Sequence, residues 1–427
     1  MPIRKTIYFL AVSFLVLCSC EKNPGAQSET SDGSMDYVTL QSKSPKRGVS
    51  FNFGQLPDND IPLLGPACSW SYNWGGNTSG QAFSLFSEYG MDFCPMAWNA
   101  NWSEDNFRAF KAQHPECQYI LAYNEPNLTD QANMTPSKAA EDWPRLVAIA
   151  RELGMKIIAP AMNYGTLDGY HDPWKWYDEF FAQPGVSLDD IDGIALHCYM
   201  GSAHAMKSFV DQSKKYGKPV WLTEFCNWAN NNISAEAQMS YMVEAINLLE
   251  ADSDVFRYAW FIPRGNGDAQ CHNSLLQSAK PFGLTDLGKV FVNMSTQDKS
   301  LYYKPGDVVP AEHYTSVQGD IHLAPCSDTK GILELRDLKK GATVHYQIEV
   351  PQDGTYAFEF RYHTFFPSPL SVILDNRELG VNELENTDYQ WKNSKVDIPL
   401  TKGRHVFSLT GTTGFPITLN WFRFEQK

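Results

Sequence analysis

The chain has 427 residues, of which 43% are hydrophobic and 20% charged. This composition excludes a disordered chain, which would be poorer in apolar residues and carry more net charge. The 35 basic and 49 acidic residues give a net charge of −14, which argues against nucleic acid as a partner because phosphate binding requires a basic surface. The length predicts two or three domains.

Residues 1–20 are typical of a lipoprotein signal peptide. Arg4 and Lys5 precede an apolar run from Ile7 to Cys18, which is too short to span a bilayer as a helix. The sequence Leu17-Cys18-Ser19-Cys20 resembles a bacterial lipobox, in which Cys20 becomes the lipidated first residue of the mature protein. An ordinary secretory signal cleaved nearby is the alternative. We therefore expect an exported bacterial lipoprotein, anchored to a membrane in the periplasm or at the cell surface.

The segment that follows, 21–46, is polar and is expected to be a flexible tether. Nine cysteines occur in the sequence, and seven remain once Cys18 and Cys20 are set aside. An odd number leaves at least one free thiol. No Cys-x-x-Cys pair exists, which argues against a zinc site, and we expect neither a metal nor a cofactor.

Short apolar runs alternate with helical patterns over residues 47–300. Amphipathic stretches such as 136–153 lie between the runs, and Ser103, Thr135 and Ser234 are expected N-caps. Eight strand–helix units in about 250 residues predict an α/β fold, a (β/α)₈ TIM barrel. A doubly wound sheet is the alternative, but this sequence has no glycine-rich phosphate-binding loop after the first strand, as that fold would have. The expected strands are 48–53, 67–73, 91–98, 119–124, 156–162, 191–199, 219–224 and 255–262.

The pattern changes after residue 300, where helical periodicity ends. A linker is expected at 296–306, followed by short alternating strands separated by turns. This spacing predicts an all-β jelly-roll sandwich over 307–427. The expected strands are 332–337, 342–350, 355–363, 370–375, 395–400, 404–410 and 416–424.

Two of the expected barrel strands lead to glutamates. Glu125 follows the fourth strand, and Glu224 ends the seventh. The C-terminal ends of barrel strands carry the chemistry in such folds, and the fourth and seventh strands face one another. Two opposed carboxylates are what glycoside hydrolysis requires: an acid with a raised pKa protonates the leaving oxygen, and an ionised partner attacks the anomeric carbon or activates water. A salt bridge to a neighbour is the alternative for either residue.

The segments ILAYNEPN (120–127), IALHCY (194–199), VWLTEF (220–225) and FGLTDLG (282–288) resemble glycoside hydrolase family 128. The resemblance covers about residues 48–295 and implies a retaining, endo-acting β-1,3-glucanase. It implies that Glu125 is the general acid/base and Glu224 the nucleophile. It also implies that Asn124 binds the 2-hydroxyl, and that His197 or Tyr199 orients Glu224 and keeps it ionised.

The same resemblance assigns aromatic residues to the substrate. Trp260, on the eighth strand, would floor the sugar at the point of cleavage. Trp98 and Trp70 would stack on neighbouring sugars, with ordinary packing as the alternative for both.

The C-terminal region resembles family 6-like carbohydrate-binding modules in residues 310–314, 350–362, 400–405 and 419–422. The resemblance implies glycan binding, with Trp391 and Tyr389 as a platform. Pro310 and Asn420 stand where that family has acidic residues, which argues against its structural calcium. A sandwich that only supports the barrel is the alternative.

These features together predict a lipid-anchored, monomeric hydrolase acting on β-glucan polysaccharide or oligosaccharide. Another β-glycan, with β-1,4 or mixed linkages, is the alternative within this class. An inactive surface glycan-binding lipoprotein is the alternative outside it, and the intact pair of glutamates argues against that reading.

Overall fold

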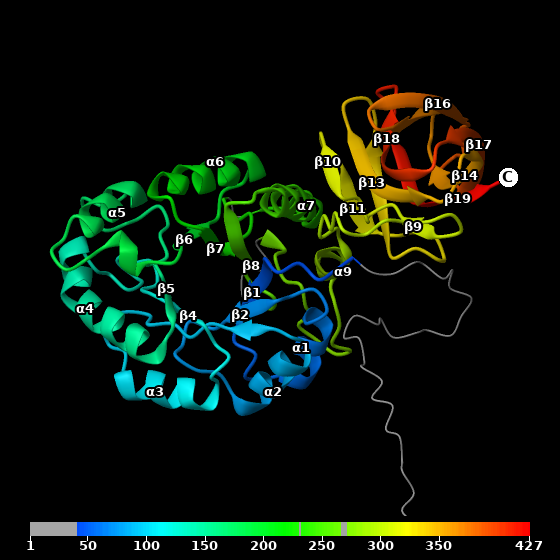
Figure 1. Cartoon of the computed structure of the whole chain (residues 1–427). Coiled ribbons are helices and arrows are strands. Elements are labelled where there is room, and N and C mark those ends of the chain that lie inside the picture. Colours follow the sequence, from blue (N-terminus) through cyan, green and yellow to red (C-terminus); the bar gives the residue numbers. More distant parts are fainter. Residues whose placement is uncertain (1–40, 230–231, 266–270) are drawn as a thin grey trace, which may run out of the picture.

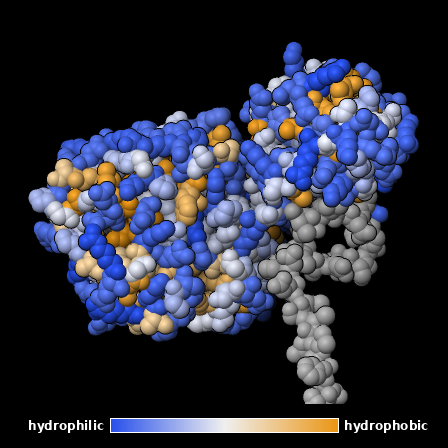
Figure 2. Space-filling model, viewed as in Figure 1, coloured by the Kyte–Doolittle hydropathy of each residue, from blue (hydrophilic) through white to orange (hydrophobic). Residues whose placement is uncertain are grey.

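The computed structural model describes residues 41–229, 232–265 and 271–427. It consists of an N-terminal region built on parallel strands and a separate C-terminal region of antiparallel strands, as predicted (Figure 1). The predicted signal peptide and residues 21–40 of the predicted tether lie outside the described residues. Within the described part of the chain, no helix is both long and apolar enough to cross a membrane. The visible face of both regions is mostly hydrophilic, in keeping with the acidic composition (Figure 2).

All eight strands predicted for the N-terminal region are present. A six-stranded sheet has the order β3-β2-β1-β8-β7-β6, and β4 pairs with β5. Isolated parallel bridges join the β4–β5 pair to its neighbours on both sides, between Met96 and Leu121 and between Ile158 and Gly193. The strands are β1 (Arg47–Ser50), β2 (Trp70–Tyr72), β3 (Asp92–Phe93), β4 (Tyr119–Leu121), β5 (Lys156–Ile158), β6 (Ile194–Cys198), β7 (Val220–Phe225) and β8 (Val255–Trp260).

Helices alternate with these strands and lie around the outside of the sheet (Figure 1). The predicted caps are confirmed, because the side chains of Ser103, Thr135 and Ser234 each accept a hydrogen bond from a backbone N–H in the first turn of the helix that follows. The helices are α1 (Pro57–Leu64), α2 (Gly80–Glu88), α3 (Glu104–Gln113), α4 (Pro136–Leu153), α5 (Pro173–Phe181), α6 (Ala203–Ser213), α7 (Ala235–Ala251) and α9 (Asp286–Asn293).

The described end of the predicted tether is bound to the folded region. The Lys43 ammonium donates to the backbone carbonyls of Gly65 (3.1 Å) and Tyr89 (2.6 Å). The Lys46 ammonium donates to the carbonyls of Glu250 (2.9 Å) and Asp252 (2.8 Å). Residues 41–46 therefore belong to the folded region, and the prediction of a flexible tether extending to residue 46 is wrong for them.

The C-terminal region contains two antiparallel sheets, ordered β10-β13-β18-β15-β16 and β11-β12-β19-β14-β17. The seven predicted strands are present. Of the strands not predicted, β10, β11 and β16 are edge strands, and β9 pairs with β19. The strands are β9 (Val308–Pro310), β10 (Ser316–Gln318), β11 (His322–Pro325), β12 (Leu333–Leu338), β13 (Thr343–Val350), β14 (Gly354–His363), β15 (Ser368–Leu374), β16 (Arg377–Leu384), β17 (Lys392–Leu400), β18 (Gly403–Gly411) and β19 (Ile417–Gln426).

The two regions pack against one another through α7 and α9 on one side and β10, β11 and β12 on the other (Figure 1). The buried Tyr314 hydroxyl donates to Asn247 Oδ1 on α7 (3.0 Å). The Ser295 hydroxyl donates to the carbonyl of Tyr314. The C-terminal region therefore covers helices of the N-terminal region and leaves the C-terminal ends of the parallel strands open.

Candidate active site

Glu125 lies just beyond β4 in a backbone conformation held by hydrogen bonds. Its φ of +44° is in the left-handed region, which costs energy for a residue with a Cβ and is often found at functional sites. Its N–H donates to the carbonyl of Ala161 (3.0 Å), and its carbonyl accepts from the N–H of Leu128 (3.0 Å). The Asn163 side chain, beyond β5, donates to Glu125 Oε1 (3.0 Å).

Glu224 lies on β7 and is almost fully buried. Its Oε1 accepts hydrogen bonds from the Tyr72 hydroxyl (2.8 Å) and the Trp74 indole N–H (2.7 Å). Its Oε2 accepts from the Tyr199 hydroxyl. Three donors on an otherwise buried carboxylate fix its orientation.

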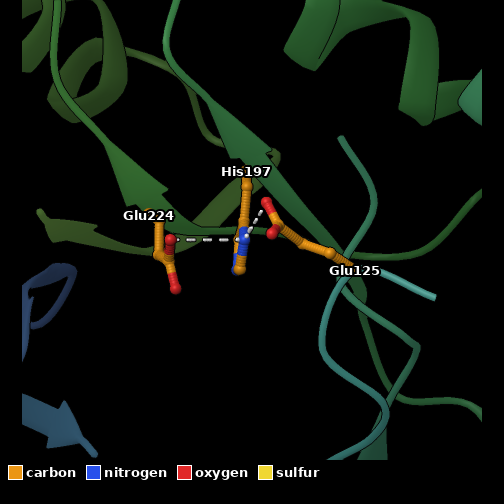
Figure 3. Close-up of side chains that lie close together, drawn as sticks. All are labelled: Glu125, His197 and Glu224. Carbon is orange, nitrogen blue, oxygen red and sulfur yellow. Dashed lines mark hydrogen bonds and ion pairs between the residues drawn. The ribbon is translucent and has the colours of Figure 1, made fainter. Parts of the chain in front are cut away.

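His197, on β6, stands between the two glutamates (Figure 3). Its Nδ1 lies 2.9 Å from Glu125 Oε1 and 3.4 Å from Glu224 Oε2. A carboxylate oxygen of each glutamate and a ring nitrogen of His197 lie within 4.8 Å of one another. The imidazole therefore contacts both carboxylates through the same nitrogen, Nδ1.

The charges of these groups shift their pKa values in opposite directions. Burial raises the pKa of Glu125, but the positive charge of His197 and the hydrogen bonds from His197 and Asn163 outweigh it, so that the pKa is lowered. Burial lowers the pKa of His197, but the charges of Glu224 and Glu125 raise it above its usual value. The lowered pKa of Glu125 in the free enzyme is opposite in direction to the raised pKa expected for the acid.

A cavity of about 640 Å³ opens over the two glutamates. One wall is aromatic and includes Trp74, Tyr199, Trp228 and Phe261, and Trp98 also lines the cavity. Polar side chains line it near Glu125, namely Asn124, Gln131 and Asn163. Apolar ring faces combined with a few placed polar groups are typical of a site for a small polar ligand such as a sugar.

Six of the predicted site residues meet here: Asn124, Glu125, His197, Glu224, Tyr199 and Trp98. Of the two residues expected to orient Glu224, Tyr199 donates a hydrogen bond to it, whereas His197 lies closer to Glu125 than to Glu224.

The predicted sugar contacts of Trp70 and Trp260 are wrong, because both side chains are fully buried away from the cavity. The Trp70 indole donates to the carbonyl of Lys46 (3.0 Å), and its ring packs against Trp221. The Trp260 indole donates to the carbonyl of Asn273 (2.8 Å). Trp391 lies in the C-terminal region, where its indole donates to the Ser327 hydroxyl (3.0 Å).

Several functional side chains were not predicted from the sequence. Tyr72 and Trp74 bind Glu224, Asn163 binds Glu125, and Trp228 and Phe261 line the aromatic wall. Trp74 follows the end of β2 and Asn163 follows the end of β5, so position beyond a strand end was the signal that could have found both.

Paired buried glutamates at the ends of parallel strands, beneath an aromatic-walled cavity, define the class as glycoside hydrolase. In agreement with this, the chain matches the family described as "Glycosyl hydrolase catalytic core" over residues 48–291, more than half of its length, and belongs to it.

Solved structures identify the family more closely. The chain is 39% identical to a subgroup II endo-β-1,3-glucanase of glycoside hydrolase family 128 from Pseudomonas viridiflava, with a TM-score of 0.54 over 59% of this chain and 98% of that one. The corresponding Sorangium cellulosum enzyme is 30% identical, with a TM-score of 0.51 over 58% and 98% of the two chains. The chain therefore belongs to glycoside hydrolase family 128.

A curated relative is more distant. Alkali-sensitive linkage protein 1 of Schizosaccharomyces pombe is 26% identical over 262 residues. The match covers 59% of this chain and 45% of that protein, so the chain spans less than half of the relative's length.

Proposed function

We propose that this hydrolase cleaves β-1,3-glucan at internal bonds with retention of anomeric configuration. The observation that carries the proposal is the spacing of Glu125 and Glu224, whose nearest oxygens lie within 4.8 Å. Retaining enzymes hold their carboxyl groups about 5–5.5 Å apart, whereas inverting enzymes leave about 6.5–9.5 Å for a water molecule. The two family 128 relatives, both endo-β-1,3-glucanases by name, support the choice of substrate.

The contacts of each glutamate assign its role in a double displacement. Glu224 is the nucleophile, because three donors hold its carboxylate in a fixed orientation at the wall of the cavity. Glu125 protonates the leaving oxygen in the first step and deprotonates a water molecule in the second. When Glu224 becomes an ester, its negative charge disappears, and His197 and Asn163 still hold Glu125 in the ionised form that a base requires.

Digestion of a panel of glucans tests this proposal. Linear β-1,3-glucan should give oligosaccharides of several lengths at early times, as internal cleavage requires, while linear β-1,4-glucan stays intact. Product sizing by chromatography gives the readout, with Glu224→Gln as the inactive control. Cleavage of the β-1,4 chain in preference to the β-1,3 chain would overturn the choice of substrate, and release of glucose alone would overturn internal cleavage.

We also infer that the eight parallel strands close into a (β/α)₈ barrel. The order of the six-stranded sheet, the β4–β5 pair and the bridges on both sides of that pair support closure. The two antiparallel sheets of the C-terminal region support a jelly-roll sandwich. We also propose that the enzyme is a monomer, because a single chain supplies both glutamates and the residues that line the cavity.

The C-terminal region is proposed to bind glucan through Trp391 and Tyr389. Tyr389 is 62% exposed and stacks on Phe365, and Trp391 packs against His363 with ring centroids 4.5 Å apart. A cavity of about 100 Å³ lies beside Tyr389 and His363. A second binding surface on the same chain keeps the enzyme near an insoluble substrate.

Trp391→Ala is expected to weaken binding to insoluble β-1,3-glucan by about 3- to 10-fold, since one aromatic contact is lost. Binding is measured by depletion from solution with both the reference and the variant in the Glu224→Gln background. Activity on a short soluble oligosaccharide should not change. Tyr302→Ala is the matched control, because Tyr302 is an aromatic residue of the preceding linker whose ring lies against the Arg404 guanidinium. Equal losses from both substitutions would contradict a binding role for Trp391.

Membrane anchoring through Cys20 is proposed from the sequence Leu17–Cys20. Cys20→Ala should therefore move the protein from the membrane fraction to the soluble fraction of the exporting cell and abolish fatty-acid labelling. Cys18→Ala is the matched control and should leave both unchanged. Persistent membrane association of the Cys20 variant would contradict the lipobox and favour another mode of retention.

A further inference from the structure

The loop that follows Glu125 folds back over the end of β4. The N–H of Gln131 donates to the carbonyl of Leu128 (3.3 Å), and the N–H of Ala132 donates to the carbonyl of Asn124 (3.2 Å). The N–H of Met134 donates to the carbonyl of Pro126 (2.8 Å). These hydrogen bonds bring Gln131 directly beside Asn124, at the edge of the active-site cavity, which both side chains line.

The two side chains are joined by one hydrogen bond. Asn124 Nδ2 donates to Gln131 Oε1 (3.1 Å). An amide nitrogen has two hydrogens, so Nδ2 keeps a second hydrogen while Gln131 accepts the first. Because Gln131 lines the cavity, this bond turns the amino end of the Asn124 amide towards the cavity.

Within the described part of the chain, no hydrogen bond on the other side of the Asn124 amide fixes its orientation. Asn124 Oδ1 is buried, and among the described residues it has no hydrogen-bond partner. The two ends of a carboxamide are almost equal in size, so packing alone does not distinguish one orientation from the other reversed by half a turn. The hydrogen bond to Gln131 is therefore the one hydrogen bond of this amide within the described residues, and it makes Nδ2 the donor for as long as Gln131 presents its oxygen.

We propose that Gln131 is a positioning residue, which holds the Asn124 amide with its amino group directed at a hydroxyl of the sugar beside the scissile bond. This inference rests on the proposed function of the site. A hydroxyl held in this way contributes most in the transition state, where hydrogen bonds to the 2-hydroxyl of the reacting sugar strengthen. If the amide reversed, a carbonyl oxygen would replace the donor and that contribution would be lost.

Two substitutions separate the acceptor of Gln131 from its bulk. Gln131→Glu keeps an acceptor at the same place, whereas Gln131→Met keeps the length of the side chain and removes the acceptor. Gln212→Met is the matched control, because Gln212 is an exposed glutamine on α6, away from the cavity. Each enzyme is assayed at its own pH optimum, because the added carboxylate of the glutamate variant lies near Glu125.

The substrates are an aryl β-1,3-gluco-oligosaccharide and its counterpart that lacks the 2-hydroxyl on the reacting sugar. Gln131→Met should lower kcat/KM on the first by about 10-fold, mainly through kcat, and leave the 2-deoxy substrate almost unaffected. The ratio between the two substrates should therefore shrink for Gln131→Met and persist for Gln131→Glu and Gln212→Met. An equal loss on both substrates would assign Gln131 a merely structural role and overturn the proposal.

A neutron crystal structure of the free protein and of Gln131→Met distinguishes the amide nitrogen from the oxygen and gives a readout that does not require turnover. The wild-type chain should show Asn124 Nδ2 bonded to Gln131, and the variant should show the amide reversed or in two orientations. An unchanged, single orientation in the variant would overturn the inference. An inactive wild-type enzyme on every β-1,3-glucan would instead refute the proposed function, so the two failures are distinguishable.

Discussion

Glu224→Gln is expected to lower kcat on β-1,3-glucan by about 1,000-fold or more, as removal of a covalent nucleophile does in other hydrolases. The amide is neutral and cannot form the glycosyl-enzyme. The substitution preserves the shape of the side chain, and the aromatic walls of the cavity are untouched. The variant should therefore still bind oligosaccharide, with a dissociation constant close to the KM of the wild-type enzyme, as measured by calorimetry.

The control for this experiment is Glu236→Gln, which removes an exposed carboxylate from the first turn of α7 and should leave kcat unchanged. Melting temperatures of both variants show whether the fold is intact. Near-normal turnover by a well-folded Glu224→Gln variant would remove Glu224 from the mechanism.

Glu125→Ala should have a large effect that depends on the leaving group. General acid catalysis contributes about 10²–10⁴-fold, so cleavage of glucan, whose leaving group is a sugar alkoxide, should fall by about that factor. A dinitrophenyl glucoside oligomer leaves without a proton, so its glycosylation step should be almost unaffected. Hydrolysis of the glycosyl-enzyme then becomes slow, because no base remains to activate water.

Azide distinguishes the two carboxylates. A small anion enters the space left by the Glu125 side chain and attacks the glycosyl-enzyme without needing a base. Azide should therefore restore turnover of the dinitrophenyl substrate by Glu125→Ala and yield a β-glycosyl azide, detected by mass spectrometry and NMR. The reverse pattern, with an α-glycosyl azide from Glu125→Ala and a β-glycosyl azide from Glu224→Ala, would exchange the assigned roles.

The catalytic pair could be predicted from the sequence because each glutamate belongs to a strand end. Parallel strands bring their C-terminal ends to one side, so Glu125 and Glu224 meet although 99 positions of sequence numbering separate them. The local contacts could not be predicted in the same way. Whether His197 lies nearer one glutamate or the other depends on strand register, which shifts between Leu196 and His197 where β6 pairs with β7.

The tryptophans show a different limit. Trp70 and Tyr72 occupy alternate positions of β2, so their side chains share a face, and Trp74 follows beyond the end of that strand. Depth along the strand then decides their roles, at about 3.3 Å per residue. Trp70 packs against Trp221 in the core, Tyr72 reaches Glu224, and Trp74 lines the cavity. A hydrophobic pattern reveals the face of a strand but not how far each residue lies from its open end.

The strands missed in the C-terminal region have a related explanation. Both β10 and β16 are sheet edges, and their residues are mostly exposed or half-buried. Their sequences, Ser316–Gln318 and Arg377–Leu384, contain few apolar residues because only part of one face meets the core. The central strands β13 and β14 bury a regular set of side chains and were predicted within one residue at each end.

The stereochemistry of cleavage is the most direct test of the proposed double displacement. Proton NMR of a β-1,3-gluco-oligosaccharide during the first minutes of digestion identifies the anomer formed before mutarotation. The spacing of Glu125 and Glu224 predicts that the β-anomer appears first. Initial release of the α-anomer would contradict double displacement and the assignment of Glu224 as a nucleophile.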